Sequence, residues 1–247
     1  MEKFKKVCML VALLLAMVPV IFSHSGFTAV ANSEIYPIKN SQNAPYHIVG
    51  RIDFNNGRSG IGFVIGNNTV ATNRHVGINF KGKDSGTFKL AFNQKNNGPK
   101  SLGDFSVVSV KFAPHKDDDV AILTVVPKNG AKNVGEVVQQ AAIIDAGFID
   151  KKWLETSENN LHIAGYPSLG DRNIMWGSDG KILDFAFNSN RTYKSDILAS
   201  PGASGSPLFN KNNQVVGINS SFYADDPKIS DGFLFKEDLL QFVLDNR

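Results

Sequence analysis

The most informative stretch of the 247-residue sequence reads Pro201-Gly202-Ala203-Ser204-Gly205-Ser206-Pro207, between two segments typical of β-strands. Gly202 lets the backbone turn so that its own N–H and that of Ser204 point to one spot. Two such groups can hold the oxyanion of a tetrahedral acyl intermediate. The stretch therefore predicts a serine nucleophile with an oxyanion hole at Gly202 and Ser204, although by itself it equally fits a glycine-rich turn.

A serine hydroxyl is a weak nucleophile unless a base takes its proton. His75 is the best candidate because it follows the predicted strand 69–72, which would hold it rigidly at the edge of a cleft. The remaining histidines after residue 31 fit other roles. His47 opens a strand, His115 lies in a polar loop, and His162 lies inside an apolar strand where a packed histidine is expected.

A buried carboxylate is needed to orient the imidazole and fix its tautomer. Asp119 meets that need because it is the last of three aspartates and adjoins the apolar residues 120–123, whereas Asp117 and Asp118 are expected to be solvated. His75, Asp119 and Ser204 are separated by 44 and 85 residues, in the order found in chymotrypsin.

The pattern after the first 46 residues predicts short strands divided by Gly and Asn turns, which is typical of a β-sandwich or barrel. The predicted strands are 47–54, 60–65, 69–72, 87–92, 105–112, 119–126, 161–165, 180–187, 206–209, 214–219 and 232–235. Residues 236–246 have apolar side chains at helical spacing and predict a C-terminal helix. Residues 134–144 fit a strand or a helix, and the polar residues 145–160 are the expected connection between two halves.

The N-terminus has the layout of a secretory signal peptide, with three lysines before the apolar run 7–22 and Ala-Val-Ala at 29–31. We expect cleavage before Asn32 and a secreted protein without membrane attachment. A transmembrane anchor is the alternative, since the run is only slightly shorter than a span. Cys8 is the one cysteine, so the mature chain would have no disulfide and no thiol nucleophile.

The composition is that of a globular protein, 42% hydrophobic and 20% charged. Outside Glu2, Lys3, Lys5 and Lys6, 23 basic side chains face 22 acidic ones, so no electrostatic case exists for nucleic-acid binding. The three aspartates lack the spacing of a calcium loop. We expect no metal, no cofactor, a protein or peptide as the substrate, and a monomer.

The sequence resembles the cysteine-free bacterial branch of chymotrypsin-like serine proteases, which includes glutamyl endopeptidases, staphylococcal serine protease-like (Spl) enzymes and exfoliative toxins. The resemblance covers nearly the whole chain after the predicted signal peptide. It rests on residues 68–75 (Asn-Thr-Val-Ala-Thr-Asn-Arg-His), 119–123 (Asp-Val-Ala-Ile-Leu), 163–167 (Ile-Ala-Gly-Tyr-Pro), 202–210 (Gly-Ala-Ser-Gly-Ser-Pro-Leu-Phe-Asn) and 215–218 (Val-Val-Gly-Ile).

This resemblance implies an all-β fold of two six-stranded antiparallel β-barrels with a C-terminal α-helix. The catalytic residues would lie in the cleft between the barrels. We accordingly divide the chain into a signal peptide at 1–31, an N-terminal β-barrel at 32–150, and a C-terminal β-barrel with its helix at 151–247. The resemblance also carries the oxyanion-hole role to the N–H groups of Gly202 and Ser204.

The positions that select the substrate differ within this branch. Glutamyl endopeptidases recognise glutamate through a threonine five residues before the nucleophile and a histidine fifteen residues after it. Ala199 and Asn219 occupy those positions here. Together with Ser200 and Ser220 they are expected to line a small, neutral pocket, which makes the Spl enzymes the nearer comparison.

The sequence thus predicts a secreted serine endopeptidase of restricted specificity that acts through an acyl-enzyme. An enzyme with one narrow host target, like the exfoliative toxins, fits the same residues. A catalytically silent binding or immune-evasion protein on the same fold is the other alternative, suggested by Ala203 where this branch usually has asparagine. The complete triad argues against it, because a discarded active site has no physical reason to keep all three residues.

Overall fold

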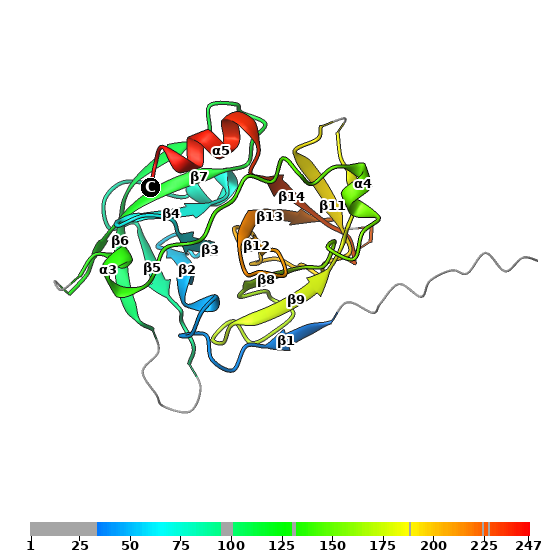
Figure 1. Ribbon diagram of the computed structural model, residues 1–247. Coiled ribbons are helices and arrows are strands. Elements are labelled where there is room, and N and C mark those ends of the chain that lie inside the picture. The colour runs from blue at the N-terminus through cyan, green and yellow to red at the C-terminus, as the bar shows by residue number, and fades with distance from the viewer. Residues whose placement is uncertain (1–33, 95–100, 130–131, 188, 224, 227) are drawn as a thin grey trace, which may run out of the picture. The chain divides into compact units, whose positions relative to one another are not determined.

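The computed structural model describes residues 34–94, 101–129, 132–187, 189–223, 225–226 and 228–247, and Figure 1 shows its elements. The predicted signal peptide, residues 1–31, and its expected cleavage before Asn32 lie outside the described residues. Two antiparallel β-sheets and a few short helices make up the described fold. Among these helices, none is long and apolar enough to cross a membrane.

The first sheet closes into a barrel of six strands, in the order β2 (Val49–Phe54), β3 (Ser59–Val64), β4 (Thr69–Thr72), β7 (Ala121–Pro127), β6 (Gly103–Phe112) and β5 (Gly86–Leu90). Successive side chains of a strand point to opposite faces, so burial alternates along it. In β5, Phe88 and Leu90 are buried, whereas Thr87 and Lys89 are half-buried. This alternation is the pattern by which the sequence predicts the strands.

The second sheet has eight strands, in the order β1 (Ile35–Pro37), β9 (Trp176–Gly180), β8 (Leu161–Gly165), β12 (Pro207–Phe209), β13 (Val215–Phe222), β14 (Ser230–Leu234), β11 (Thr192–Ser195) and β10 (Ile182–Phe185). The expected number here is six, and the sequence pattern does not predict β1, β9 or β11. The reason is that β9 reads Trp-Gly-Ser-Asp-Gly, without apolar alternation, and the other two have three and four residues. β1 pairs with β9, although residues 35–37 fall in the range assigned to the N-terminal barrel.

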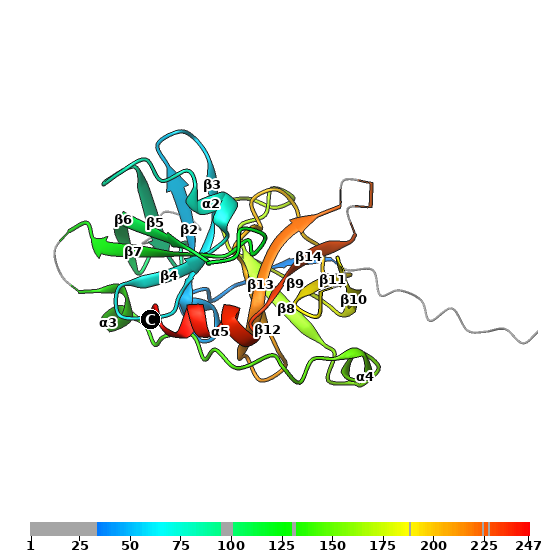
Figure 2. The ribbon, with the colours of Figure 1, turned by 90° about the horizontal axis from the view of Figure 1, so that it is seen from above.

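The described helices are α2 (Arg74–Gly77), α3 (Val134–Val137), α4 (Lys151–Leu154), α5 (Glu237–Leu244) and a 3-10 helix (Tyr46–Ile48). The predicted C-terminal helix is confirmed as α5, which Figure 2 shows from a second side. Its buried Leu239 and Phe242 belong to the same hydrophobic core as Val70 of β4 and Leu123 of β7. The helix therefore follows the second sheet in sequence and packs onto the first barrel.

The two sheets share part of their core. Phe209 and Ile218 of the second sheet belong to the cluster that fills the first barrel. The rings of Phe63 in β3 and Phe235 after β14 lie 6.4 Å apart. A second cluster lies within the second sheet itself. This shared packing fixes where residues at the junction of the sheets meet.

Candidate active site

His75 lies in the single-turn helix α2, three residues beyond the end of β4. Asn73 precedes this helix with extended backbone, and its side-chain amide donates to the backbone carbonyl of Asp119 at 2.8 Å. That bond joins the end of β4 to the start of β7, the strand with which β4 pairs. The barrel thus brings His75 and Asp119 together although 44 residues separate them.

The Asp119 carboxylate holds His75 by two atoms. Its Oδ2 lies 2.7 Å from Nδ1 of the imidazole, and its Oδ1 accepts from the His75 backbone N–H at 2.9 Å. A carboxylate is acceptor-only when ionised, so Nδ1 carries the proton in this contact and Nε2 is left as the basic nitrogen. The arrangement orients the ring and selects the tautomer that a general base needs.

Ser220 adds a further contact to this carboxylate. Its hydroxyl donates to Asp119 Oδ2 at 2.5 Å, and its backbone carbonyl accepts from the Ser204 hydroxyl at 3.0 Å. Ser220 therefore connects the His75–Asp119 pair to Ser204. Ser220 is also one of the predicted substrate-binding residues, and that role stays a prediction. The sequence carried no signal for its contact with Asp119, because 101 residues separate the two.

The run of aspartates differs from expectation at one position. Asp117 is exposed as predicted, but the prediction that Asp118 is solvated is wrong, because its side chain is buried and lies 3.3 Å from Arg191. Burial raises the pKa of Asp118, and the Arg191 guanidinium partly opposes that rise. Asp119 is the more open of the two, with 20% of its side chain exposed.

Arg74, next to His75, supports the loop that carries the aspartates. Its guanidinium donates to the backbone carbonyls of Asp118 at 3.2 Å and His115 at 3.0 Å, and to that of Ala113. These bonds fix the backbone just before Asp119. Asn73 and Arg74 lie within residues 68–75, one of the stretches that resemble the protease family. Their position next to His75 is the sequence feature from which a role in supporting the site could have been predicted.

The loop around Ser204 is tied to both sheets. The Ser204 carbonyl accepts from the N–H of Ile61 in β3 at 2.8 Å, and the Gly205 N–H donates to the carbonyl of Asn219 in β13 at 3.0 Å. Gly202 and Gly205 have φ angles of +93° and +91°. Only glycine adopts such angles without strain, which explains why the loop has glycine two residues before Ser204 and directly after it.

The N–H groups of Gly202 and Ser204 donate to no acceptor among the described residues, whereas the Ala203 N–H donates to the Ser200 carbonyl at 2.9 Å. Two N–H groups on either side of a bonded one are therefore available to an incoming oxygen. The Ser204 hydroxyl itself points to Ser220 and forms no hydrogen bond with His75 in the described part of the chain. Such catalytic hydrogen bonds often form or tighten only when a substrate is bound.

The predicted pocket residues Ala199, Ser200, Asn219 and Ser220 are all buried and uncharged. The Asn219 amide nitrogen donates to the Ala203 carbonyl at 3.2 Å, while its side-chain oxygen is buried without a partner among the described residues. Ser200 accepts from the Leu169 N–H at 3.3 Å. In the described part of the chain, no three His, Cys, Asp or Glu side chains cluster as metal ligands would.

The other histidines lie apart from this arrangement. His162 stacks on Phe209, with ring centroids 4.9 Å apart, and its Nε2 is buried without a hydrogen-bond partner among the described residues. His115 pairs with Asp238 at 2.8 Å on the surface. Burial lowers the pKa of His162 below its usual 6.5, although Asp179 partly opposes the shift, and burial also lowers the pKa of His47.

These lowered pKa values predict a loss of stability in mild acid. Between the folded and unfolded pKa values the unfolded chain binds more protons, so the free energy of unfolding decreases as pH falls below about 6.5. His162→Phe should reduce this loss, because phenylalanine keeps the stacking on Phe209 and binds no proton. Urea unfolding at pH 7.5 and 5.5 measures the effect. An equal loss in the wild type and the variant would contradict it.

Known proteins resemble this chain in sequence. A profile described as a trypsin-like peptidase domain matches residues 60–218. A glutamyl endopeptidase of Staphylococcus epidermidis is 33% identical over 180 residues, which is 68% of this chain. The match spans 59% of that relative's length.

Solved structures share the fold. A Glu endopeptidase in complex with MPD superposes with a TM-score of 0.67 at 19% identity, over 87% of this chain and 96% of that one. A thermostable serine protease, AL20, from an extremophilic microorganism superposes with a TM-score of 0.63 at 18% identity, over 80% of this chain and 95% of that one. The predicted all-β, chymotrypsin-like fold with a C-terminal helix is confirmed.

Proposed function

The chain belongs to the trypsin-like peptidase family, and we propose that it is a serine endopeptidase in which Ser204, His75 and Asp119 form the catalytic triad. Ser204 Oγ attacks the scissile carbonyl carbon while His75 Nε2 takes the hydroxyl proton. The negative charge develops on the carbonyl oxygen, where the N–H groups of Gly202 and Ser204 stabilise it. Asp119 stabilises the imidazolium that forms.

The second half of the reaction uses the same groups. His75 returns the proton to the leaving amine, the C–N bond breaks, and the acyl group stays on Ser204 as an ester. A water molecule then attacks the ester with His75 again as base, and the acid product leaves. The reaction consumes one water and needs no cofactor.

The observation that carries this proposal is that the Asp119 carboxylate forms hydrogen bonds with both Nδ1 and the backbone N–H of His75. The bond from the backbone N–H fixes the carboxylate, and the contact with Nδ1 then orients the ring. The Ser220 hydroxyl donates to the same carboxylate, and its backbone carbonyl accepts from the Ser204 hydroxyl. From that position, rotation about the Cα–Cβ bond of Ser204 turns its hydroxyl away from the Ser220 carbonyl.

The pocket residues support restricted, Spl-like specificity for small or neutral side chains before the scissile bond. Ala199, Ser200, Asn219 and Ser220 offer a glutamate carboxylate no cationic partner. Burying an unpaired carboxylate costs several kcal/mol, so this pocket disfavours glutamate. The preference stated in the name of the staphylococcal relative is therefore not expected here. We further propose that the protein is secreted after removal of residues 1–31 and acts as a monomer.

A second candidate function is a silent binding protein on the same fold. It is favoured by the Ser204 hydroxyl, which donates to Ser220 and not to His75. Such a protein would hold a protein ligand in the cleft, and Ser204→Ala would leave that binding intact while no peptide is cleaved by either form.

Cleavage of a proteome-derived peptide library tests the enzyme directly. We expect a small set of cleaved sequences with small or neutral residues before the scissile bond. Ser204→Ala should abolish cleavage, by about 10⁶-fold in kcat. Ser109→Ala is the matched control, since Ser109 is exposed in β6 and its hydroxyl bonds only Thr124 among the described residues. No cleavage by the wild type, or equal cleavage by Ser204→Ala, would overturn the proposal.

A further inference from the structure

A groove of about 330 Å³ lies beside the candidate active site and contains three arginines. Its walls come from β2, from the hairpin between β2 and β3, and from one residue of the loop between β8 and β9. We call it the arginine groove, and define it by Arg51, Asp53, Arg58, Ser59 and Arg172.

The groove has an excess of positive charge. Asp53 is its one carboxylate, and that group is already paired with Arg51 at 2.9 Å and with Lys89 at 2.9 Å. Arg58 and Arg172 are both exposed and have no carboxylate partner in the described part of the chain. Two guanidinium groups are therefore available to an incoming anion.

Arg172 links the groove to the predicted oxyanion hole. A Cβ atom placed on Gly202 would lie 3.7 Å from Arg172 Nε and 3.8 Å from Nη2. The same guanidinium donates to the Ser59 hydroxyl, and Arg51 donates to the Arg172 carbonyl at 2.6 Å. Arg172 lies in the loop between β8 and β9 of the second sheet but is bonded to residues of the first barrel, and its guanidinium is within van der Waals contact distance of the position that a side chain on Gly202 would occupy.

The groove lies on the β3 side of Gly202. Ser59 begins β3, and two residues later Ile61 binds the Ser204 carbonyl. The predicted pocket for the acyl side is formed by other residues, among them Asn219 and Ser220 of β13, which do not line the groove. With the acyl side assigned to that pocket, the leaving segment of a substrate whose carbonyl oxygen lies at the Gly202 N–H is assigned to the side of Arg172, which lies next to Gly202. Three extended residues span roughly 10 Å, so their side chains reach the groove.

We propose that the arginine groove binds an acidic side chain within the first three residues after the scissile bond. This selects the substrate class of the proposed peptidase and rests on that function. A planar guanidinium binds a carboxylate through two parallel N–H···O bonds, which a neutral amide cannot match. Because both arginines are exposed, the preference is moderate and weakens as salt screens the charges.

Paired peptides test the inference. The best sequence from the library is synthesised with Glu or Gln at each of the first three positions after the scissile bond, and kcat/KM is measured for each pair. We expect a Glu/Gln ratio of about five or more at one position at low salt, and a smaller ratio at high salt. Ratios below twofold at all three positions would overturn the inference.

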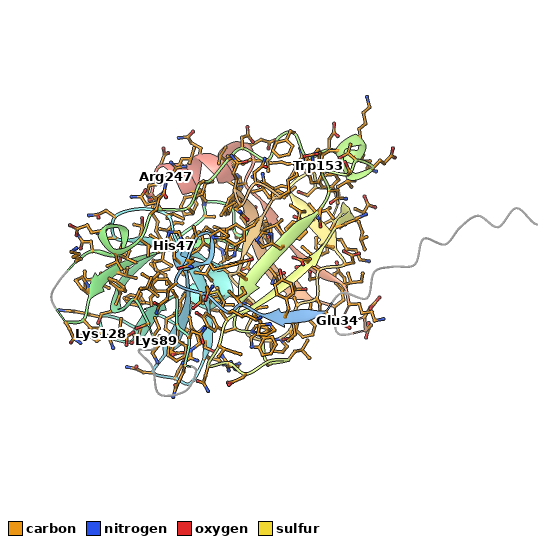
Figure 3. The ribbon with its side chains drawn as sticks, turned by 60° about the horizontal axis from the view of Figure 1, so that its bottom comes forward. Glu34, His47, Lys89, Lys128, Trp153 and Arg247 are labelled. Carbon is orange, nitrogen blue, oxygen red and sulfur yellow. The ribbon has the colours of Figure 1, made fainter. Side chains whose placement is uncertain are left out.

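Variants connect the preference to the groove. Arg172→Gln and Arg58→Gln should each lower the Glu/Gln ratio toward one. The Arg58 side chain forms no hydrogen bond or ion pair among the described residues, so its loss removes charge without loosening a loop. Lys152→Gln is the matched loss of one exposed charge, and it should keep the ratio. Lys152 is far from the groove. Figure 3 shows its neighbour Trp153 at the opposite end of the molecule from Lys89, and Lys89 pairs with Asp53 of the groove.

The two proposals fail in different ways. A preference that persists unchanged in both arginine variants would assign the effect to another part of the protein and overturn the groove. Cleavage with no acidic preference would overturn the groove and leave the peptidase standing. Absence of any cleaved peptide would overturn the peptidase.

Discussion

Replacing Asp119 by asparagine should lower kcat about 10⁴-fold while the protein stays folded. An asparagine side chain has one acceptor oxygen, whereas three donors now converge on the carboxylate from the His75 ring, the His75 backbone and Ser220. An amide NH₂ at the Oδ2 position would face Nδ1 and favour the tautomer with its proton on Nε2. That tautomer cannot take the proton of Ser204.

The control for this variant lies in the same run of aspartates. Asp117→Asn removes an exposed carboxylate two residues away and should change kcat less than twofold. Steady-state kinetics on one library peptide, with circular dichroism to verify folding, give the comparison. A loss of less than tenfold in Asp119→Asn would contradict the assigned role of this carboxylate.

Gly205→Ala is expected to destabilise the protein by at least about 3 kcal/mol and to remove activity. A Cβ atom there would lie 2.0 Å from the Ile61 carbonyl oxygen and 2.8 Å from the Thr72 hydroxyl. Thr72 donates to the same carbonyl at 2.6 Å, so neither atom can move without breaking a buried bond. The φ angle of +91° adds strain of its own.

Gly82→Ala separates the cost of the steric contact from the cost of the positive φ angle. Gly82 also has a positive φ, +111°, but no atom lies within 4 Å of its would-be Cβ. Its replacement should therefore cost only the backbone strain, about 1–2 kcal/mol. Urea unfolding of both variants measures the difference. Equal destabilisation would mean that the close contact between the Ser204 loop and β3 contributes nothing to stability.

Local pattern predicted much of this fold. Alternating apolar residues predicted the strands of the first barrel, and helical spacing predicted α5, because both periodicities reflect one buried face. The pattern failed at β9, where glycines leave no apolar face to detect. It also failed at Asp118, which is buried next to Arg191, the residue before β11 of the second sheet.

At the candidate site, too, local features could be predicted from the sequence and long-range contacts could not. His75 could be chosen over the three other histidines that follow the predicted signal peptide, because its position after a strand is a local feature. Contacts between residues that are far apart in the sequence produce no pattern in the residues around either partner. The hydrogen bond of Ser220 to Asp119 spans 101 residues, and that of Arg172 to Ser59 spans 113 residues. Only the packing of the two sheets brings such residues together.

Active-site labelling tests the central claim most directly. The purified protein is treated with a fluorophosphonate, which reacts with an activated serine, and the adduct is located by mass spectrometry. We predict one adduct, on Ser204, formed far more slowly in His75→Ala and absent in Ser204→Ala. A protein that gains no adduct, or gains it on another residue, would contradict the assignment of Ser204 as a nucleophile activated by His75.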